Sequence, residues 1–227
     1  LILSRTLVFS NWNTTLSATN VTIQSGGVMT LPGAFTNNAM SNNVVVACSN
    51  LTIEAGGSIN VDYLGYARGM SDWALGNGRG SGSAAAGYGG MAGGNGLTYG
   101  SAIAPVDPGS GGRHGNNLGW PGGHGGGAVR IQANGTVLVN GSITANGRSA
   151  GNYGSLPGSG GGIAITCDTF AGTNTGANGI LRADGGGCAD SYGAGGGRVA
   201  VVYAHAAPSA VPMVCSAAGG AGPGGNG

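Results

Sequence analysis

Three runs of three glycines recur along this chain at a fixed spacing. They occupy residues 125–127, 160–162 and 195–197, a step of 35 residues, and each is followed by a short segment rich in Val, Ile and Ala. Short β-branched segments bounded by glycine predict strands. A repeat of this length is typical of proteins in which one unit cannot bury its own apolar face and must stack on the next.

A second strand is predicted in each unit, because apolar and polar residues alternate there next to glycine. This pattern occurs in residues 21–31, 51–61, 137–147 and 180–185, and it opens again at residue 214. The chain has no initiator Met and stops within a glycine tract, so we expect it to be a fragment or a processed product.

We expect a single domain with three regions. They are N-terminal coils in residues 1–64, a glycine-rich insertion in 65–124, and regular 35-residue repeats in 125–227, of which the last is incomplete.

The composition indicates an ordered chain with few charges. Of 227 residues 53 are Gly, 41% are hydrophobic and only 7% are charged, whereas ordinary domains carry about 25% charged residues. Disordered chains combine low hydrophobicity with high charge, which is the opposite pattern. The net charge is +1, and all eight basic residues are Arg. We therefore expect no nucleic-acid partner, and no run of about 18 apolar residues predicts a membrane span.

The cysteines predict covalent links between neighbouring units. Four cysteines allow three pairings, and none of them has the C-x-x-C spacing of a metal site. Buried thiols and a zinc site with help from His114 or His124 are the alternatives. We favour one or two disulfides and no metal or other cofactor. The candidates are Cys48, Cys167, Cys188 and Cys215, with Cys167 and Cys188 as a plausible pair across adjacent units.

Five Asn-x-Ser/Thr triplets are candidate N-glycosylation sites, although such triplets also arise by chance in a chain rich in Asn and Thr. They lie at Asn13, Asn20, Asn50, Asn134 and Asn140. They favour an extracellular or cell-surface location.

The glycine tracts have two explanations. Gly loses the most backbone entropy on folding, so its accumulation calls for a geometric reason. The tracts, in residues 76–127, 147–162 and 185–197, are either flexible loops or closely packed extended segments related to polyproline II. Their recurrence in successive units favours packing. On that interpretation a larger side chain is most harmful at Gly126, Gly161 and Gly196.

The insertion carries the candidate binding residues. Insertions in repeat proteins often lie on one face and bind ligands, and flat aromatic rings among Asn and Gly suit sugars or a neighbouring subunit. The alternative is that these rings form a local core. The candidates are Tyr66, Trp73, Tyr88, Tyr99 and Trp120. Tyr153 and Tyr192, in the shorter tracts, are expected to pack as a ladder.

An enzymatic alternative rests on few acids. Polysaccharide-active enzymes need paired or clustered carboxylates, and Glu54, Asp62 and Asp184 occupy related positions that could form a stacked row. Only seven acids occur in the whole chain, so we expect no catalysis.

The chain resembles the glycine-rich repeat regions of large cell-surface and secreted proteins. The resemblance rests on residues 51–66, 99–105 and 125–131 and covers about 51–203. It implies an all-β fold, a right-handed parallel β-solenoid with glycine-rich excursions, and an adhesive or scaffolding role outside the cell. The tracts also resemble the polyglycine II bundles of phage tail-tip adhesins and of a glycine-rich antifreeze protein, which implies the local geometry only.

These observations leave two main classes of function. The first is a structural, adhesin-like repeat that self-associates into a fibre or surface layer, or stacks on neighbouring repeats of a longer chain. The second is a module that binds glycans or a surface through the insertion. Ice binding and a polysaccharide-active enzyme are minor alternatives.

Overall fold

The structure is a computed structural model, and it describes residues 1–11, 14–37, 42–82, 85–93, 96–116, 119–151, 154–174, 176, 178–207 and 213–227. These residues form thirteen strands in two sheets, in which every pair of neighbouring strands is parallel.

Sheet A contains β1 (Ile2–Leu3), β3 (Thr15–Ile23), β5 (Asn43–Ile53), β7 (Ala128–Ala133), β8 (Thr136–Val139), β10 (Gly162–Ala171) and β12 (Arg198–Ala206). Sheet B contains β2 (Thr6–Val8), β4 (Val28–Thr30), β6 (Ser58–Asn60), β9 (Ser142–Thr144), β11 (Ile180–Arg182) and β13 (Val214–Ser216). Apart from β7 and β8, which both lie in sheet A, consecutive strands alternate between the sheets.

The sequence pattern explains the strands. Along β5 buried and partly exposed side chains alternate, as expected when one face of a strand covers a core and the other faces outward. The parallel register then places like residues in columns, such as Val46, Ile131 and Ile165 in sheet A. A second column, of Ile59, Ile143 and Leu181, comes from sheet B. Both columns belong to the same buried core, and each of these side chains contributes roughly 1.5–3 kcal/mol by its burial.

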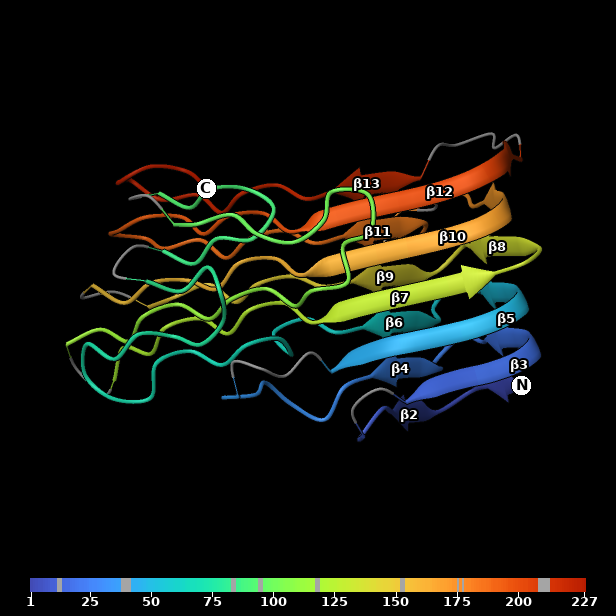
Figure 1. Cartoon of the computed structure of the whole chain (residues 1–227), viewed down its shortest axis with the longest axis horizontal. Helices are drawn as coiled ribbons and strands as arrows, with labels where there is room; N and C mark the ends of the chain where they lie inside the picture. Colours follow the sequence, from blue (N-terminus) through green and yellow to red (C-terminus); the bar gives the residue numbers. More distant parts are fainter. Residues whose placement is uncertain are drawn as a thin grey trace.

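The predicted fold class, a right-handed parallel β-solenoid with polyglycine II-like excursions, is wrong. The structure shows all-β architecture with parallel sheets, but not an extended solenoid. The longest axis of the molecule runs along the strands and not along the direction in which they stack (Figure 1). In sheet A, β8 pairs with both β5 and β10, so that β5, β7, β10 and β8 close a circuit of four paired strands. The result is a compact body.

The spacing of units also departs from a uniform step. Ile163 lies opposite Val129 on one side and Val199 on the other, so the offsets are 34 and 36 residues and not 35. The physical reason is that strand register follows the apolar columns, and these do not keep a constant distance from the glycine triplets.

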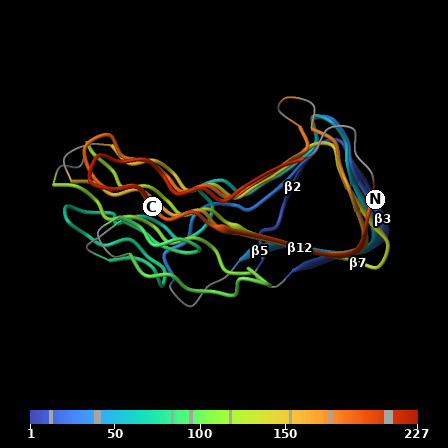
Figure 2. The same ribbon diagram turned by 90° about the horizontal axis from the view of Figure 1, so that it is seen from above.

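The glycine-rich segments lie together beside the two sheets (Figures 1 and 2). We call the described residues of 65–127, 145–161, 183–197 and 217–227 the glycine layer. Backbone hydrogen bonds join its segments, for example from Gly109 N–H to Gly126 O (2.8 Å), from Gly126 N–H to Ser159 O (2.9 Å) and from Gly160 N–H to Gly195 O (3.1 Å). The segments are therefore packed against one another, as the packing alternative predicted, and not separate loops.

Candidate functional site

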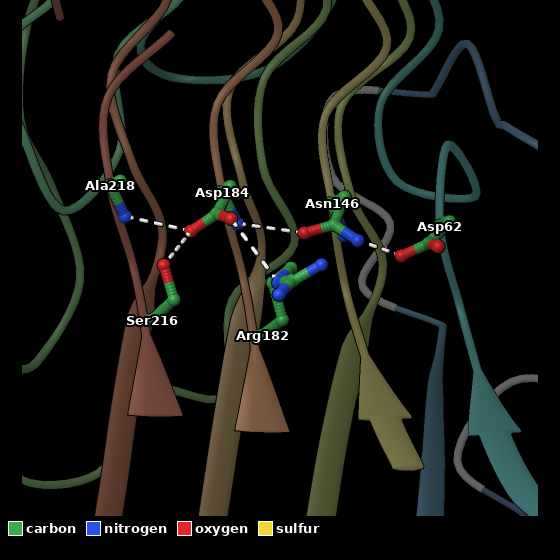
Figure 3. Close-up of polar contacts among 6 residues, drawn as sticks. All are labelled: Asp62, Asn146, Arg182, Asp184, Ser216 and Ala218. Carbon is green, nitrogen blue, oxygen red and sulfur yellow. Dashed lines mark hydrogen bonds and ion pairs between the residues drawn. The ribbon is translucent and has the colours of Figure 1, made fainter. Parts of the chain in front are cut away.

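Three polar residues occupy equivalent places in successive units of sheet B. Asp62, Asn146 and Asp184 each follow a strand by two residues, and the pairing of β6, β9 and β11 places them side by side (Figure 3). The Asp62 carboxylate accepts a hydrogen bond of 2.7 Å from the backbone N–H of Asn146. The Asn146 amide oxygen accepts one of 2.9 Å from the backbone N–H of Asp184. We call these three residues the polar row.

Asp184 continues the polar row into the next unit. Its Oδ1 accepts hydrogen bonds from the backbone N–H of Ala218 (2.8 Å) and from the Ser216 hydroxyl, and its Oδ2 lies 3.4 Å from Arg182 Nε (Figure 3). Each side chain of the row therefore bridges to the backbone of the unit that follows, where strands of sheet B pass into the glycine layer. The bonds to the Asp62 and Asp184 carboxylates are charge-assisted, and such bonds are about twice as strong as neutral ones.

The expected row of acids is formed in part. Asp62 and Asp184 lie in one row, but Asn146 separates them, and Glu54 lies elsewhere, at the turn that follows β5. An acid and base pair must face the same bond of a substrate. In the polar row one oxygen of each carboxylate accepts a hydrogen bond from the backbone of the next unit. The two carboxylates therefore link units to one another.

The five predicted binding aromatics do not form one surface. Tyr66 is buried and packs edge to face against Phe35, with ring centroids 4.8 Å apart. Tyr88 is fully buried against Tyr99, at 4.7 Å. The Tyr99 hydroxyl donates to Pro108 O (2.5 Å) and accepts a hydrogen bond from Ser110 Oγ (2.9 Å). Burial raises the pKa of both Tyr88 and Tyr99. For Tyr66 and Tyr88 the alternative interpretation, a local core, is correct, and Tyr99 is half-buried against it.

The two tryptophans of the insertion are more accessible. Trp73 is 53% exposed, and its backbone has φ of 58°. Trp120 is half-buried against Gly151, where a β-carbon would lie 2.7 Å from the indole ring. Tyr153, one member of the expected tyrosine ladder, lies outside the described residues.

Sequence reasoning missed Asn146 and Tyr63. A signal for Asn146 exists, because Asn146-Gly147 and Asp184-Gly185 each begin at the second residue after a strand of sheet B. Asp62, the first member of the row, is followed by Tyr63, where the other two units have Gly147 and Gly185. The backbone φ of Tyr63 is 64°. A non-glycine residue in this conformation is uncommon and costs about 1–2 kcal/mol.

His114 and His124 are part of the glycine layer. His124 Nδ1 accepts a hydrogen bond of 3.1 Å from the backbone N–H of Arg68. Burial, together with the charges of Arg68 and Arg148, lowers the pKa of His124 to about 4. His114 is buried, and its Nδ1 lies 3.0 Å from Gly115 O. Within the described ranges no three His, Cys, Asp or Glu side chains are grouped so that they could hold a metal ion.

The predicted disulfides are not formed, and all four cysteines are free. Cys48 faces Ala133 in the adjacent strand β7, and Cys167 lies in β10 on the other side of β7. Two strand spacings, about 10 Å, exceed the distance of about 7 Å that a disulfide can span. Cys188 lies in the glycine layer, with its Sγ 3.1 Å from Gly151 O, and Cys215 lies in the edge strand β13. Burial raises the pKa of the Cys48, Cys167 and Cys188 thiols.

Three of the five candidate glycosylation sites are exposed, namely Asn20, Asn50 and Asn134. Asn13 lies outside the described residues, and Asn140 is half-buried, with its Oδ1 3.2 Å from the backbone N of Thr173. Asn50 Nδ2 donates to Asn20 Oδ1 (3.0 Å), and Asn50 Oδ1 accepts from Thr136 N–H (2.9 Å). These amides therefore link strands of sheet A, and their glycosylation stays a prediction.

The three glycines singled out by their spacing have no room for a side chain. A β-carbon would lie 1.9 Å from Ala145 O at Gly126, 1.8 Å from Gly127 O at Gly161, and 2.0 Å from Ala217 O at Gly196. Backbone atoms thus occupy the space at all three positions.

A scan against protein-family models gives no match, and searches of curated proteins and of solved structures give none either. In the described part of the chain no helix is long and apolar enough to cross a membrane.

Proposed function

We propose that this chain is a structural, non-catalytic module of an extracellular or cell-surface protein, and that it self-associates through the edges of its sheets. The observation that carries the proposal is that both sheets end in parallel edge strands that expose apolar side chains. Such edges are templates for pairing with further strands.

One edge consists of β12 and β13. Tyr203 lies opposite the buried Cys167, in a core column, yet it is 48% exposed because no described strand covers it. Its ring stacks on Phe170, with centroids 6.0 Å apart. Arg198 N–H donates to Gly161 O, and backbone groups alternate in direction along a strand. The backbone groups of Val199, Val201 and Tyr203 consequently face the open edge.

The opposite edge consists of β1 and β2. Ile2 is 70% exposed, and an apolar pocket of about 300 Å³ opens beside β2 and β3, lined in part by Leu7, Phe9 and Leu16. An apolar pocket at one edge and exposed apolar side chains at the other are complementary. Addition of a second copy, edge to edge, would bury both.

The extracellular assignment rests on the sequence. The exposed Asn-x-Ser/Thr triplets, the low charge and the resemblance to glycine-rich surface proteins all agree with it.

Sedimentation velocity over a range of protein concentrations tests self-association. We expect larger species at high concentration, and we expect Tyr203→Lys to abolish them by placing a charge at the open edge. Gln132→Lys is the matched control, because Gln132 is exposed on the central strand β7, away from both edges. A monomer at all concentrations, or equal loss in both variants, would contradict the proposal.

A further inference from the structure

One segment of the glycine layer exposes several large apolar side chains. The chain that follows β6 extends to the end of the layer away from the sheets (Figures 1 and 2). Within it Met70, Trp73 and Leu75 are all more than half exposed. Three exposed apolar side chains within six residues make this segment a candidate surface for interaction.

The backbone holds Trp73 in this exposed position. Its N–H donates to Gly115 O (3.1 Å), and on its other side His114 N–H donates to Ala74 O (2.9 Å). An Ala74 N–H to Ser71 O bond of 2.9 Å closes the turn. The left-handed φ of Trp73 is costly for a bulky residue, and such strain persists only where the surroundings determine it. The indole is therefore presented on an ordered backbone.

A cation covers one face of the indole. The Arg113 guanidinium carbon lies 5.0 Å from the ring centroid, and Arg113 Nη2 donates to Gly154 O (3.0 Å). This contact fixes the plane of the ring. Since 53% of Trp73 remains exposed, part of the residue is accessible to a ligand.

The preceding residue, Asp72, supplies an exposed polar group. The Asp72 carboxylate is 51% exposed, and its Oδ1 is 4.0 Å from His114 Nδ1. An exposed carboxylate accepts hydrogen bonds from hydroxyl groups, while an aromatic ring packs on C–H groups. The same carboxylate repels acidic sugars and resists burial in a bilayer.

From this geometry we propose that Trp73, Asp72 and Arg113 form a binding site for a neutral pyranose polysaccharide. The exposed part of the Trp73 ring stacks on a sugar ring, Asp72 accepts hydrogen bonds from hydroxyl groups, and Arg113 positions the indole. This site is independent of the sheet edges and goes beyond the proposed structural role.

Affinity electrophoresis in gels that contain a neutral glucan, a galactomannan or the acidic polysaccharide alginate tests the proposal. We expect retardation by at least one neutral polysaccharide and not by alginate. Trp73→Gly should weaken the affinity about tenfold or more, and Asp72→Asn should weaken it less.

Tyr63→Gly is the matched control, because Tyr63 is also an exposed aromatic residue with a positive φ. Glycine fits the backbone at both positions, so both variants should keep the fold, which circular dichroism checks. Two electrophoresis results would overturn the site: no retardation by any neutral polysaccharide, or equal retardation of the unchanged protein and Trp73→Gly. Binding to phosphatidylcholine vesicles that depends on Trp73, in place of binding to polysaccharide, would overturn it as well. Sedimentation of Trp73→Gly should match that of the unchanged protein, so failure of this site is distinguishable from failure of the edge proposal.

Discussion

The amide oxygen of Asn146 lies 2.9 Å from the backbone nitrogen of Asp184 and accepts its hydrogen bond. This contact joins two units through one side chain. Because the Asp62 carboxylate likewise binds the backbone of Asn146, loss of Asn146 breaks the middle link of the polar row.

We expect Asn146→Ala to lower the free energy of unfolding by about 1 kcal/mol, the usual contribution of one such hydrogen bond. Urea unfolding measures it. Asn134→Ala, at an exposed position outside the polar row, should change stability by less than about 0.5 kcal/mol. Equal stability of the two variants would show that the row contributes nothing.

Asn146→Asp separates hydrogen bonding from charge. It keeps an acceptor for Asp184 but places a third carboxylate between two others. We expect a destabilisation that shrinks as salt is added, because salt screens the repulsion between partly exposed charges. A loss of stability that does not respond to salt would argue against this explanation.

Gly161 is a position in the glycine layer where added volume should be harmful. A β-carbon there would lie 1.8 Å from Gly127 O, and backbone cannot move away as a flexible side chain would. We expect Gly161→Ala to destabilise by about 3 kcal/mol or more.

Gly33→Ala is the control for Gly161→Ala, because no atom lies within 4 Å of its β-carbon position. We expect it to be neutral or slightly stabilising. Thermal unfolding followed by circular dichroism compares the two. If Gly161→Ala melts at the same temperature as Gly33→Ala, the segments of the glycine layer are not packed as described.

His124 should make stability depend on pH. Its pKa falls from 6.5 to about 4 in the folded state, through burial and the charges of Arg68 and Arg148. The unfolded chain therefore binds a proton first on acidification, and stability is full above about pH 6.5 and declines as the pH falls towards 4. The loss is on the order of 1–2 kcal/mol after allowance for solvent screening.

Urea unfolding between pH 7 and pH 4 measures this loss. His124→Gln, which can keep an acceptor for Arg68 N–H, should flatten the profile. His205→Gln, in the exposed part of β12, is the control and should leave most of the slope in place. An unchanged profile in His124→Gln would show that another group causes the pH dependence.

Much of the local structure could be read from the chain. The alternation in residues 51–61 and the apolar segments after each glycine triplet predicted strands that the structure contains, because side chains on a strand alternate between core and surface. The crowding at Gly126, Gly161 and Gly196 was also foreseeable, since glycine recurs where backbones approach closely.

Other features depended on which segments become neighbours. Cys48 and Cys167 lie in β5 and β10, two strands of the same sheet with similar sequence patterns. Strand β7 lies between them, so their sulfur atoms are too far apart to form a disulfide. Tyr66, Tyr88 and Trp73 are all aromatic residues of the same glycine-rich insertion. Tyr66 and Tyr88 are nevertheless buried and Trp73 is exposed, because the burial of a ring depends on which segments pack against it.

The sequence by itself determined the strands, the parallel stacking of like residues and the need for glycine between them, since these follow from side-chain periodicity and size. Only the tertiary structure decided the overall form, the compact arrangement of two sheets with a glycine layer in place of an extended solenoid. It also decided that Asp62, Asn146 and Asp184 meet in one row. The physical reason is that both outcomes depend on strand register and on contacts between segments tens of residues apart, which local patterns do not encode.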